Sequence, residues 1–166
     1  MSANFTLNLE KAMEHLHRNG AFLTGNVDGK VNTMTISWGD IGFQWRRPVF
    51  ITLVRESRYT KEFIDKSGEF TVTIPFYDSM KEALAFCGSK SGRDYDKIKE
   101  CNLNLIDSDK VNTPVIKSNG MHYECKVIYK QPLDLKAMDK ELLDTFYNDG
   151  NNHVLYYGEI LNCYKL

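Results

Sequence analysis

Two arginines stand three residues apart in the stretch VRESRYTKEF, residues 54–63, together with a serine and a threonine. Arg55 follows a run of apolar residues, and Arg58 comes just before a predicted helix. Guanidinium groups bind phosphates and carboxylates through charge-assisted hydrogen bonds, and hydroxyls can add to such a site. The stretch therefore indicates either a solvated strand-to-helix turn or an anion site formed by Arg55, Ser57, Arg58, Tyr59 and Thr60.

A second polar group lies in VNTMTISWG, residues 31–39. Successive side chains of a strand point to opposite faces. Thr33, Thr35 and Ser37 are therefore expected on one face, and Trp38 on the other with Met34. Such a row of hydroxyls can serve as hydrogen-bond donors to a ligand, or it can consist of ordinary β-formers that face water.

A third candidate stretch is GSKSGRDYDK, residues 88–97, in which Lys90, Ser91 and Arg93 precede a predicted short helix. A glycine-bearing turn at a helix start presents free N–H groups to an anion. The order of residues matches neither the phosphate-binding Walker loop nor the dinucleotide-binding G-x-G-x-x-G motif. An ordinary loop remains the alternative.

These stretches need elements that bring them together. Apolar spacing predicts a helix at 9–19 that Gly20 ends, and Asp28-Gly29 predicts a tight hairpin within 21–38. Continuous apolar residues predict a buried strand at 48–54. A helix capped by Thr60 and ended by Gly68 follows, and then a half-buried strand at 69–76.

The second half of the chain repeats this mixture. Ser79 and Glu82 predict a capping box, and Asp94 is expected to cap the short helix that follows. Residues 102–120 read largely as loop, followed by a strand at 122–130, a short helix around 142–146 and a last strand at 153–166. Short strands with small helices suggest a mainly β, α+β domain that forms a barrel.

Composition limits the classes of function. The 166 residues predict a single domain, 1–166, and the 21 basic and 22 acidic residues give a net charge of −1, which argues against nucleic-acid binding. No apolar stretch approaches the roughly 20 residues that span a bilayer. The amino terminus lacks the pattern of a secretory signal, so we expect a cytoplasmic protein without membrane partners.

Metal and hydrolytic chemistry find little support. The four cysteines are scattered without a C-x-x-C pair, so no metal site is expected. No Ser-His-Asp or paired-carboxylate arrangement is legible. His153 opens the last strand and is either a histidine satisfied by the backbone or a candidate catalytic residue.

Four segments together resemble the flavin reductase-like proteins with an FMN-binding split barrel, and the flavoredoxin group most. They are NTMTISWGDIGFQWRRPVF, VRESRYTKEF, SGRDYDK and the late YYGEI. The resemblance runs from about residue 20 to residue 160 in the order of the family. It implies a closed, Greek-key-like β-barrel with short flanking helices, a homodimer, and a non-covalent FMN near the subunit interface.

The resemblance also implies roles for the candidate residues. Arginines and hydroxyls would hold the FMN phosphate, the Thr/Ser row would contact the polar edge of the flavin ring, and Trp38 would pack nearby. His153 would lie beside the ring and guide an electron donor or acceptor. The implied flavin-binding residues are Thr33, Thr35, Ser37, Trp38, Arg55, Ser57, Arg58, Tyr59, Thr60, Lys90, Ser91 and Arg93.

Three functions follow from this resemblance. The first is an FMN-dependent oxidoreductase that takes electrons from NADH, NADPH or a redox carrier protein and reduces an acceptor. The second is an electron-transfer flavoprotein of the flavoredoxin type with a protein partner. The third is a module that binds FMN or another phosphate-bearing ligand without catalysis.

Overall fold

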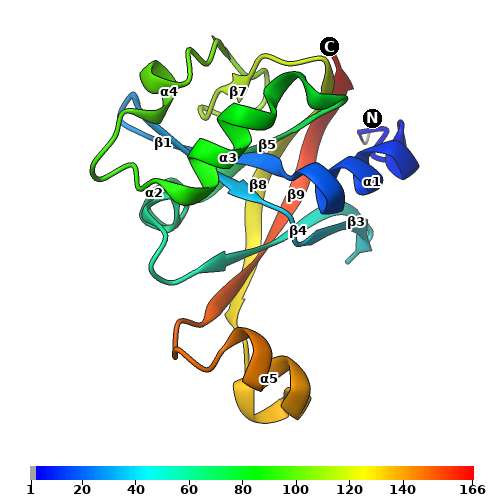
Figure 1. Ribbon diagram of the computed structural model, residues 1–166. Helices are drawn as coiled ribbons and strands as arrows, with labels where there is room; N and C mark the ends of the chain where they lie inside the picture. The colour runs from blue at the N-terminus through cyan, green and yellow to red at the C-terminus, as the bar shows by residue number, and fades with distance from the viewer. Residues whose placement is uncertain (1–2) are drawn as a thin grey trace.

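The computed structural model describes residues 3–166. A seven-stranded antiparallel sheet dominates it, with the strand order β2-β1-β5-β8-β9-β4-β3 (Figure 1). The strands of this sheet are β1 (Ala21–Val27), β2 (Lys30–Ile36), β3 (Gly39–Gln44), β4 (Arg47–Arg55), β5 (Glu69–Pro75), β8 (Gly120–Pro132) and β9 (His153–Lys165). A short pair is formed by β6 (Leu105–Ile106) and β7 (Val115–Ile116). The helices are α1 (Leu9–Asn19), α2 (Tyr59–Ser67), α3 (Lys81–Ser89), α4 (Lys97–Glu100) and α5 (Lys140–Phe146), with 3₁₀ turns at η1 (Asp78–Met80) and η2 (Leu135–Ala137).

The predicted class, mainly β with short helices, is confirmed, but the expected closure of the barrel is wrong. β2 and β3 lie at the two opposite ends of the strand order and do not pair with each other. Helices α3 and α4 pack against β2, and Lys97 of α4 donates to the backbone carbonyl of Thr33. β2 thus has β1 on one side and helical segments, instead of β3, as its other neighbours.

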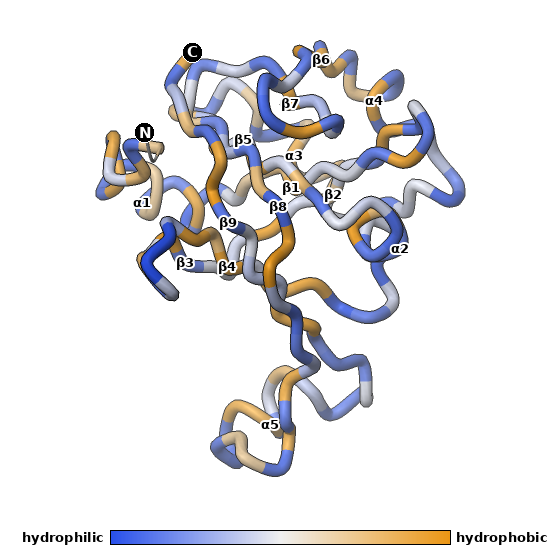
Figure 2. Tube along the Cα trace, turned by 180° about the vertical axis from the view of Figure 1, so that it is seen from behind, coloured by the Kyte–Doolittle hydropathy of each residue, from blue (hydrophilic) through white to orange (hydrophobic). Residues whose placement is uncertain are grey.

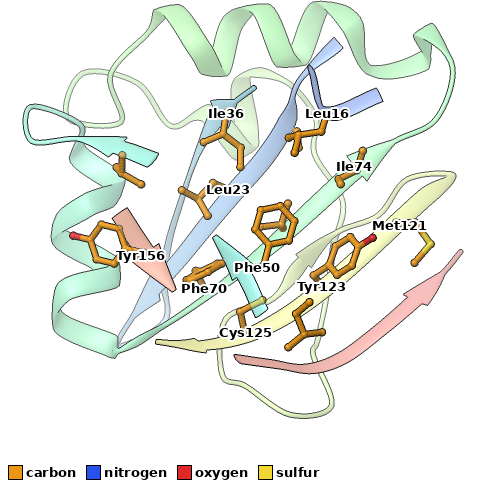
Figure 3. Packing of buried hydrophobic residues seen from close by; sticks show 14 of the residues in the cluster. Leu16, Leu23, Ile36, Phe50, Phe70, Ile74, Met121, Tyr123, Cys125 and Tyr156 are labelled. Carbon is orange, nitrogen blue, oxygen red and sulfur yellow. The ribbon is translucent and has the colours of Figure 1, made fainter. Parts of the chain in front are cut away.

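The sheet curves around the larger of two apolar clusters (Figure 3). Leu23 and Ile36 from the β1–β2 end of the strand order share a buried cluster with Phe50 and Tyr156 from the β9–β4 end. Helix α1 adds Leu16, which is fully buried like Phe50. Burying side chains of this size stabilises the fold by roughly 1.5–3 kcal/mol each.

The first hairpin forms as predicted. Asp28 and Gly29 both have positive φ angles, 51° and 84°, and Val27 pairs with Lys30 across the turn. This is the two-residue turn whose twist matches that of the flanking strands. The hairpin therefore places the candidate strand β2 beside β1 in a defined register.

Three predicted helix caps are wrong. Helix α2 begins one residue earlier than Thr60, whose hydroxyl instead accepts a hydrogen bond from Asn32 at 2.9 Å. The 3₁₀ turn η1 takes up Ser79, and no side chain caps α3. Helix α4 is capped by Asp96, which accepts from the backbone N–H of Lys99, and not by Asp94. At Thr60, a tertiary contact uses the hydroxyl that the local sequence assigns to a cap.

The prediction of a half-buried strand at 69–76 is also wrong, because β5 is buried on both faces. The hydroxyl of Thr71 donates to the carbonyl of Pro114, and that of Thr73 accepts from the N–H of Ile116. Residues 114–116 therefore cover the face that the alternation assigns to water. The strand–helix–strand order at 120–165 agrees with the prediction.

The long strands β8 and β9 leave the body and carry α5 at their far end (Figures 1 and 2). We call residues 133–152, which connect the two strands, the α5 arm. Leu142 and Phe146 of α5 are 49% and 38% exposed, so the helix is not covered by the core. The arm nevertheless returns to the sheet at His153, which pairs with Arg55 of β4.

Candidate functional site

Two adjoining cavities lie where β2, the end of β4 and the start of α2 meet. They share Met34, Arg55 and Arg58. The cationic cavity, 270 Å³, is lined by Met34, Arg55, Ser57, Arg58, Tyr59, Thr60, Ser89, Lys90, Ser91, Gly92, Arg93, Lys97 and Asn151. The aromatic cavity, 310 Å³, is lined by Met34, Thr35, Ile36, Ser37, Trp38, Leu53, Arg55, Arg58, Phe146 and His153. Every candidate residue from the sequence except Thr33 lines one of the two.

Three other cavities are larger, but each includes at most one of the candidate residues. One, of 470 Å³, lies beside the β1–β2 turn and residues 92–98, and of the candidates includes only Arg93. A second, of 780 Å³, lies between α3 and residues 100–104 and includes none, and a third, of 480 Å³, lies between the end of α1 and α3 and includes only Thr35. Acidic and basic side chains line all three. Size alone therefore does not identify the site, whereas the collection of cations does.

Arg58 is a half-buried cation of the cationic cavity. Its guanidinium donates to the carbonyl of Gly88 at 2.8 Å, and within residues 3–166 no carboxylate pairs with it. Burial lowers the pKa of Arg58, and the neighbouring guanidinium of Arg55 lowers it further. A partly desolvated positive charge without an anion is unfavourable, so this position favours an anionic ligand.

Lys97 is the second such cation, and the sequence reasoning missed it. Its ammonium donates to the carbonyls of Thr33 and Cys87, each at 2.9 Å, and the residue is only 4% exposed. Burial lowers the pKa of Lys97, and among the described residues no carboxylate pairs with it. The stretch 88–97 contains this lysine, but lysines in short polar helices are usually exposed, so nothing local marks it as buried.

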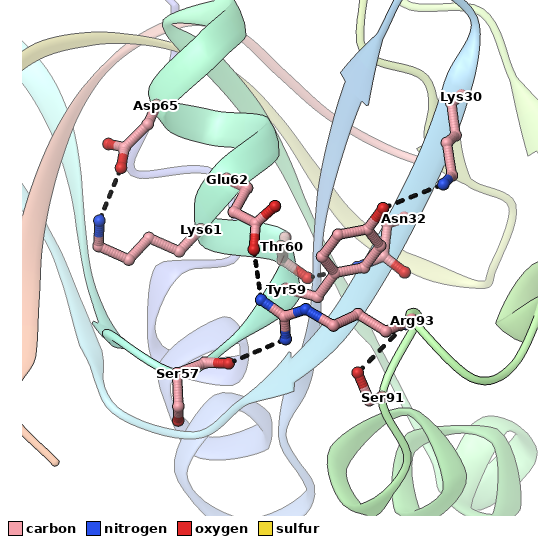
Figure 4. Close-up of polar contacts among 10 residues, drawn as sticks. All are labelled: Lys30, Asn32, Ser57, Tyr59, Thr60, Lys61, Glu62, Asp65, Ser91 and Arg93. Carbon is pink, nitrogen blue, oxygen red and sulfur yellow. Dashed lines mark hydrogen bonds and ion pairs between the residues drawn. The ribbon is translucent and has the colours of Figure 1, made fainter.

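The other two arginines mainly tie the walls of the site together. Arg55 donates to the carbonyls of Asn151 and Phe146, at 2.5 and 2.9 Å, and thereby holds the α5 arm. Arg93 pairs with Glu62, donates to the carbonyl of Ser57, and lies 4.7 Å from the ring centre of Tyr59. Figure 4 shows this side chain reaching from the turn after α3 across to α2.

The predicted row of hydroxyls is not one ligand-facing row. Thr33 donates to the carbonyl of Leu23 and accepts from Thr24, so its hydroxyl joins β2 to β1. Thr35 donates to the carbonyl of Leu84 at 2.6 Å and joins β2 to α3. The flavin contacts expected from these threonines stay predictions, and their hydroxyl protons are already used within the protein.

Aromatic side chains form one wall of the aromatic cavity. The ring of Trp38 meets the edge of Phe146 at 5.1 Å and lies 5.5 Å from the ring of His153. Phe146 comes from the α5 arm, more than 100 positions away in sequence, and no local pattern predicted its place here. The wall thus offers aromatic rings for contact with a planar ligand.

Besides the two shared arginines, His153 is the titratable group of this cavity. Burial lowers its pKa to about 4, and the positive charges of Arg55 and Arg58 act in the same direction. Its Nδ1 lies 2.9 Å from the hydroxyl of Tyr147. The imidazole is therefore neutral at neutral pH, in contrast to the charged groups of the cationic cavity.

The described residues offer little for other kinds of chemistry. Residues 3–166 contain no cluster of three or more His, Cys, Asp or Glu side chains placed to hold a metal ion. All four cysteines are free, and burial raises the pKa of Cys87 to about 12, which leaves its thiol a poor nucleophile. No helix within these residues is long and apolar enough to cross a membrane.

The protein thus has an open antiparallel sheet, with the cationic cavity and the aromatic cavity side by side. The flavin reductase like domain matches residues 13–165, and the chain belongs to that family. The resemblance found in the sequence is thereby confirmed.

Individual relatives are similar at low identity. An uncharacterized protein of Archaeoglobus fulgidus is 28% identical over 150 residues, which are 90% of this chain and 74% of that protein. The structure of flavoredoxin from Methanosarcina acetivorans is similar with a TM-score of 0.70 and 26% identity, over 89% of this chain and 68% of that one. An FMN-binding protein from Thermus thermophilus has a TM-score of 0.69 at 18% identity, over 88% and 69% of the two chains, and shows the fold alone.

Proposed function

We propose that the two cavities hold one FMN non-covalently, with its phosphate in the cationic cavity and its ring in the aromatic cavity. The observation that carries this proposal is the pair of buried or half-buried cations, Arg58 and Lys97, that lack a carboxylate partner within residues 3–166. A dianionic phosphate supplies the missing charge. The shared lining of the two cavities lets one elongated ligand reach both.

The free energies require both ends of the site. Two or three charge-assisted hydrogen bonds contribute about 3–9 kcal/mol gross. Micromolar binding needs about 8 kcal/mol net, after at least ~4 kcal/mol of association cost. Contacts between the ring and the wall formed by Trp38 must supply the remainder.

We further propose that the protein is an FMN-dependent oxidoreductase that passes electrons from reduced nicotinamide, or from a redox carrier, to an acceptor. A bound flavin accepts a hydride and passes on one or two electrons, so the protein need only orient it and tune its environment. Trp38 and Phe146 would exclude water from one side of the ring, and neutral His153 would offer a hydrogen bond without adding charge.

The alternative function is electron transfer to a protein partner. It is favoured by the similarity to flavoredoxin from Methanosarcina acetivorans at 26% identity. Structures of monooxygenase component B from Bacillus cereus and of an NADH:FAD oxidoreductase from Streptomyces globisporus share the fold at 21% and 12% identity. Both functions use the same flavin site.

We also propose that the chain forms a symmetric homodimer. Trp45 and Tyr129 are 59% and 43% exposed, and both contact the ring of Tyr157 at 5.6 and 5.2 Å. An exposed aromatic cluster of this kind is typical of an interface, and two-fold pairing is the commonest arrangement. Light scattering that returns the monomer mass with FMN bound would contradict this proposal.

Anaerobic rapid mixing of the FMN-loaded protein with NADH and NADPH tests the function. Fast bleaching of the flavin absorbance by a nicotinamide supports the oxidoreductase. Bleaching only by a reduced carrier protein supports electron transfer. If neither the nicotinamides nor the carrier protein reduces the flavin, the result supports a binding module. A protein that fails to quench FMN fluorescence on titration would contradict the flavin site itself.

A further inference from the structure

Tyr147 stands directly behind His153 at the end of the α5 arm. Its hydroxyl lies 2.9 Å from Nδ1 of His153, and the two rings meet edge to face at 5.5 Å. Both residues are 7% exposed. Tyr147 does not line the aromatic cavity, so it acts there only through the histidine.

The direction of this hydrogen bond follows from counting donors and acceptors. His153 is the hydrogen-bond partner of the Tyr147 hydroxyl among residues 3–166. A buried O–H needs an acceptor, and an unpaired one is costly. The hydroxyl therefore donates to Nδ1, and a neutral imidazole that accepts at Nδ1 carries its proton on Nε2.

Burial keeps both groups in the required state. Burial raises the pKa of Tyr147 against the opposing effect of Arg55, so the phenol keeps its proton. Burial together with Arg55 and Arg58 lowers the pKa of His153, while Asp149 acts weakly in the opposite direction. The result is a phenol O–H facing a neutral imidazole.

The other ring nitrogen is available to a ligand. His153 lines the aromatic cavity, and its Nε2 has no hydrogen-bond partner within residues 3–166. Arg55 fixes this arrangement, because it binds the carbonyls of Phe146 and Asn151 on both sides of Tyr147 and lies 5.5 Å from the centre of the tyrosine ring.

We propose that Tyr147 is a positioning residue that holds His153 in the Nε2–H tautomer, so that the aromatic cavity presents a neutral donor to a planar, carbonyl-bearing ligand. The tautomer depends only on the protein. The identity of the ligand rests on the proposed flavin function, in which a carbonyl of the ring is the acceptor.

Nitrogen NMR of the flavin-free protein labelled with ¹⁵N-histidine tests the tautomer. The His153 signals are identified by their loss in His153→Gln. We expect an unprotonated Nδ1 and a protonated Nε2 in the parent protein, and a mixture of tautomers in Tyr147→Phe, which keeps the ring and removes the donor. Tyr77→Phe, which removes an exposed hydroxyl bound to Lys11, should leave both signals unchanged.

Riboflavin binding tests the donor, because riboflavin carries the ring without the phosphate. A ligand that needs the Nε2–H form is weakened in proportion to the fraction of protein in that form, so a near-equal mixture of tautomers should weaken riboflavin about 2-fold in Tyr147→Phe and leave the ratio of FMN to riboflavin affinity unchanged. Losing the neutral hydrogen bond altogether in His153→Asn should weaken riboflavin about 2- to 12-fold. His153→Gln, whose amide nitrogen lies near the position of Nε2, should retain more affinity than His153→Asn, whose amide lies near Nδ1.

Several outcomes would overturn the proposal and not the flavin site. A protonated Nδ1 in the parent, or unchanged nitrogen signals in Tyr147→Phe, would remove the role of Tyr147. Equal riboflavin affinity in the parent, Tyr147→Phe and His153→Asn would remove the role of the Nε2–H donor. Conversely, the expected NMR result without any flavin binding would contradict the proposed function and leave the tautomer assignment standing.

Discussion

The two adjoining cavities differ in how they treat charge. In the cationic cavity, Arg58 and Lys97 keep positive charges that are bonded only to backbone carbonyls among the described residues. In the aromatic cavity, His153 is held neutral, and Arg55 and Arg58 are part of the cause. The shared arginines therefore do two things: they favour an anion at one end, and they suppress protonation at the other.

This difference teaches how one small site can recognise two unlike parts of a ligand. Charge concentrated at one end selects a phosphate strongly, since each charge-assisted bond is about twice as strong as a neutral one. A neutral donor and flat rings at the other end select a planar group without competing for the anion. The predictions below test each end separately.

The largest expected effect is a fall in the free energy of unfolding at acid pH, caused by the protonation of His153 in the aromatic cavity. Between pH 6.5 and about 4 the unfolded chain binds a proton at His153 that the folded chain refuses, so stability falls as the pH is lowered through this range. We expect a loss of about 2–3 kcal/mol from His153 by pH 4.5. Urea unfolding of the parent and of His153→Gln at pH 7 and pH 4.5 measures it.

His122 is fully buried and also has a lowered pKa, so it adds to the loss of stability at acid pH in both the parent and His153→Gln. The difference between the parent and His153→Gln isolates His153. If both lose the same stability between the two pH values, His153 is not held neutral and the contrast between the cavities disappears.

Arg58→Ala tests the charged end. Losing one charge-assisted contact of about 1.5–3 kcal/mol should weaken FMN by roughly 10- to 150-fold and riboflavin by only a few-fold. Fluorescence titration with both flavins measures the two affinities. Arg58→Lys should recover only part of the loss, because an ammonium lacks the planar two-pronged geometry.

Arg47→Ala is the matched control for this variant. Arg47 begins β4, pairs with Glu159 of β9 at 2.7 Å, and lines neither cavity. It should leave both flavin affinities unchanged. Equal weakening of FMN and riboflavin by Arg58→Ala would show that Arg58 supports the fold of the site and not the phosphate.

Inorganic phosphate alone should stabilise the flavin-free protein. At ten times its dissociation constant, a ligand that binds only the folded state adds about 1.4 kcal/mol. The melting temperature should therefore rise with phosphate in the parent and rise much less in Arg58→Ala, at matched ionic strength. A rise of equal size in both proteins would place the phosphate elsewhere.

The smallest expected effect concerns the segment that carries Lys97. Asp96 caps α4 through the N–H of Lys99, so Asp96→Ala should cost about 1 kcal/mol of stability and weaken FMN. Asp94→Ala, two residues earlier, should change neither by more than a few tenths of a kcal/mol. Thermal unfolding and FMN titration compare the pair, and equal effects of the two variants would contradict the assignment of the cap.

Much of the fold was predictable because local signals and the core agree. The Asp28-Gly29 turn needs positive φ at both residues, and the alternation of β2 and the continuous apolar run of β4 leave few other structures open. The prediction of the Thr60 cap failed because a hydroxyl has several possible hydrogen-bond partners, and a tertiary contact with Asn32 competes with the helix end. The prediction of a closed barrel failed because helices, not β3, lie against β2.

The amino-acid sequence by itself determined the first hairpin, the buried strand at 48–54 and the two late strands, since these depend on local periodicity. The gathering of Arg55, Arg58 and the 88–97 stretch near one site was implied by the resemblance to the family. Only the tertiary structure decided which cations lack an anion, that Lys97 is buried, and that Phe146 and Tyr147 approach Trp38 and His153. The physical reason is that periodicity depends on neighbours along the chain. Burial, by contrast, and with it the charge state of a side chain, depends on segments that meet only after folding.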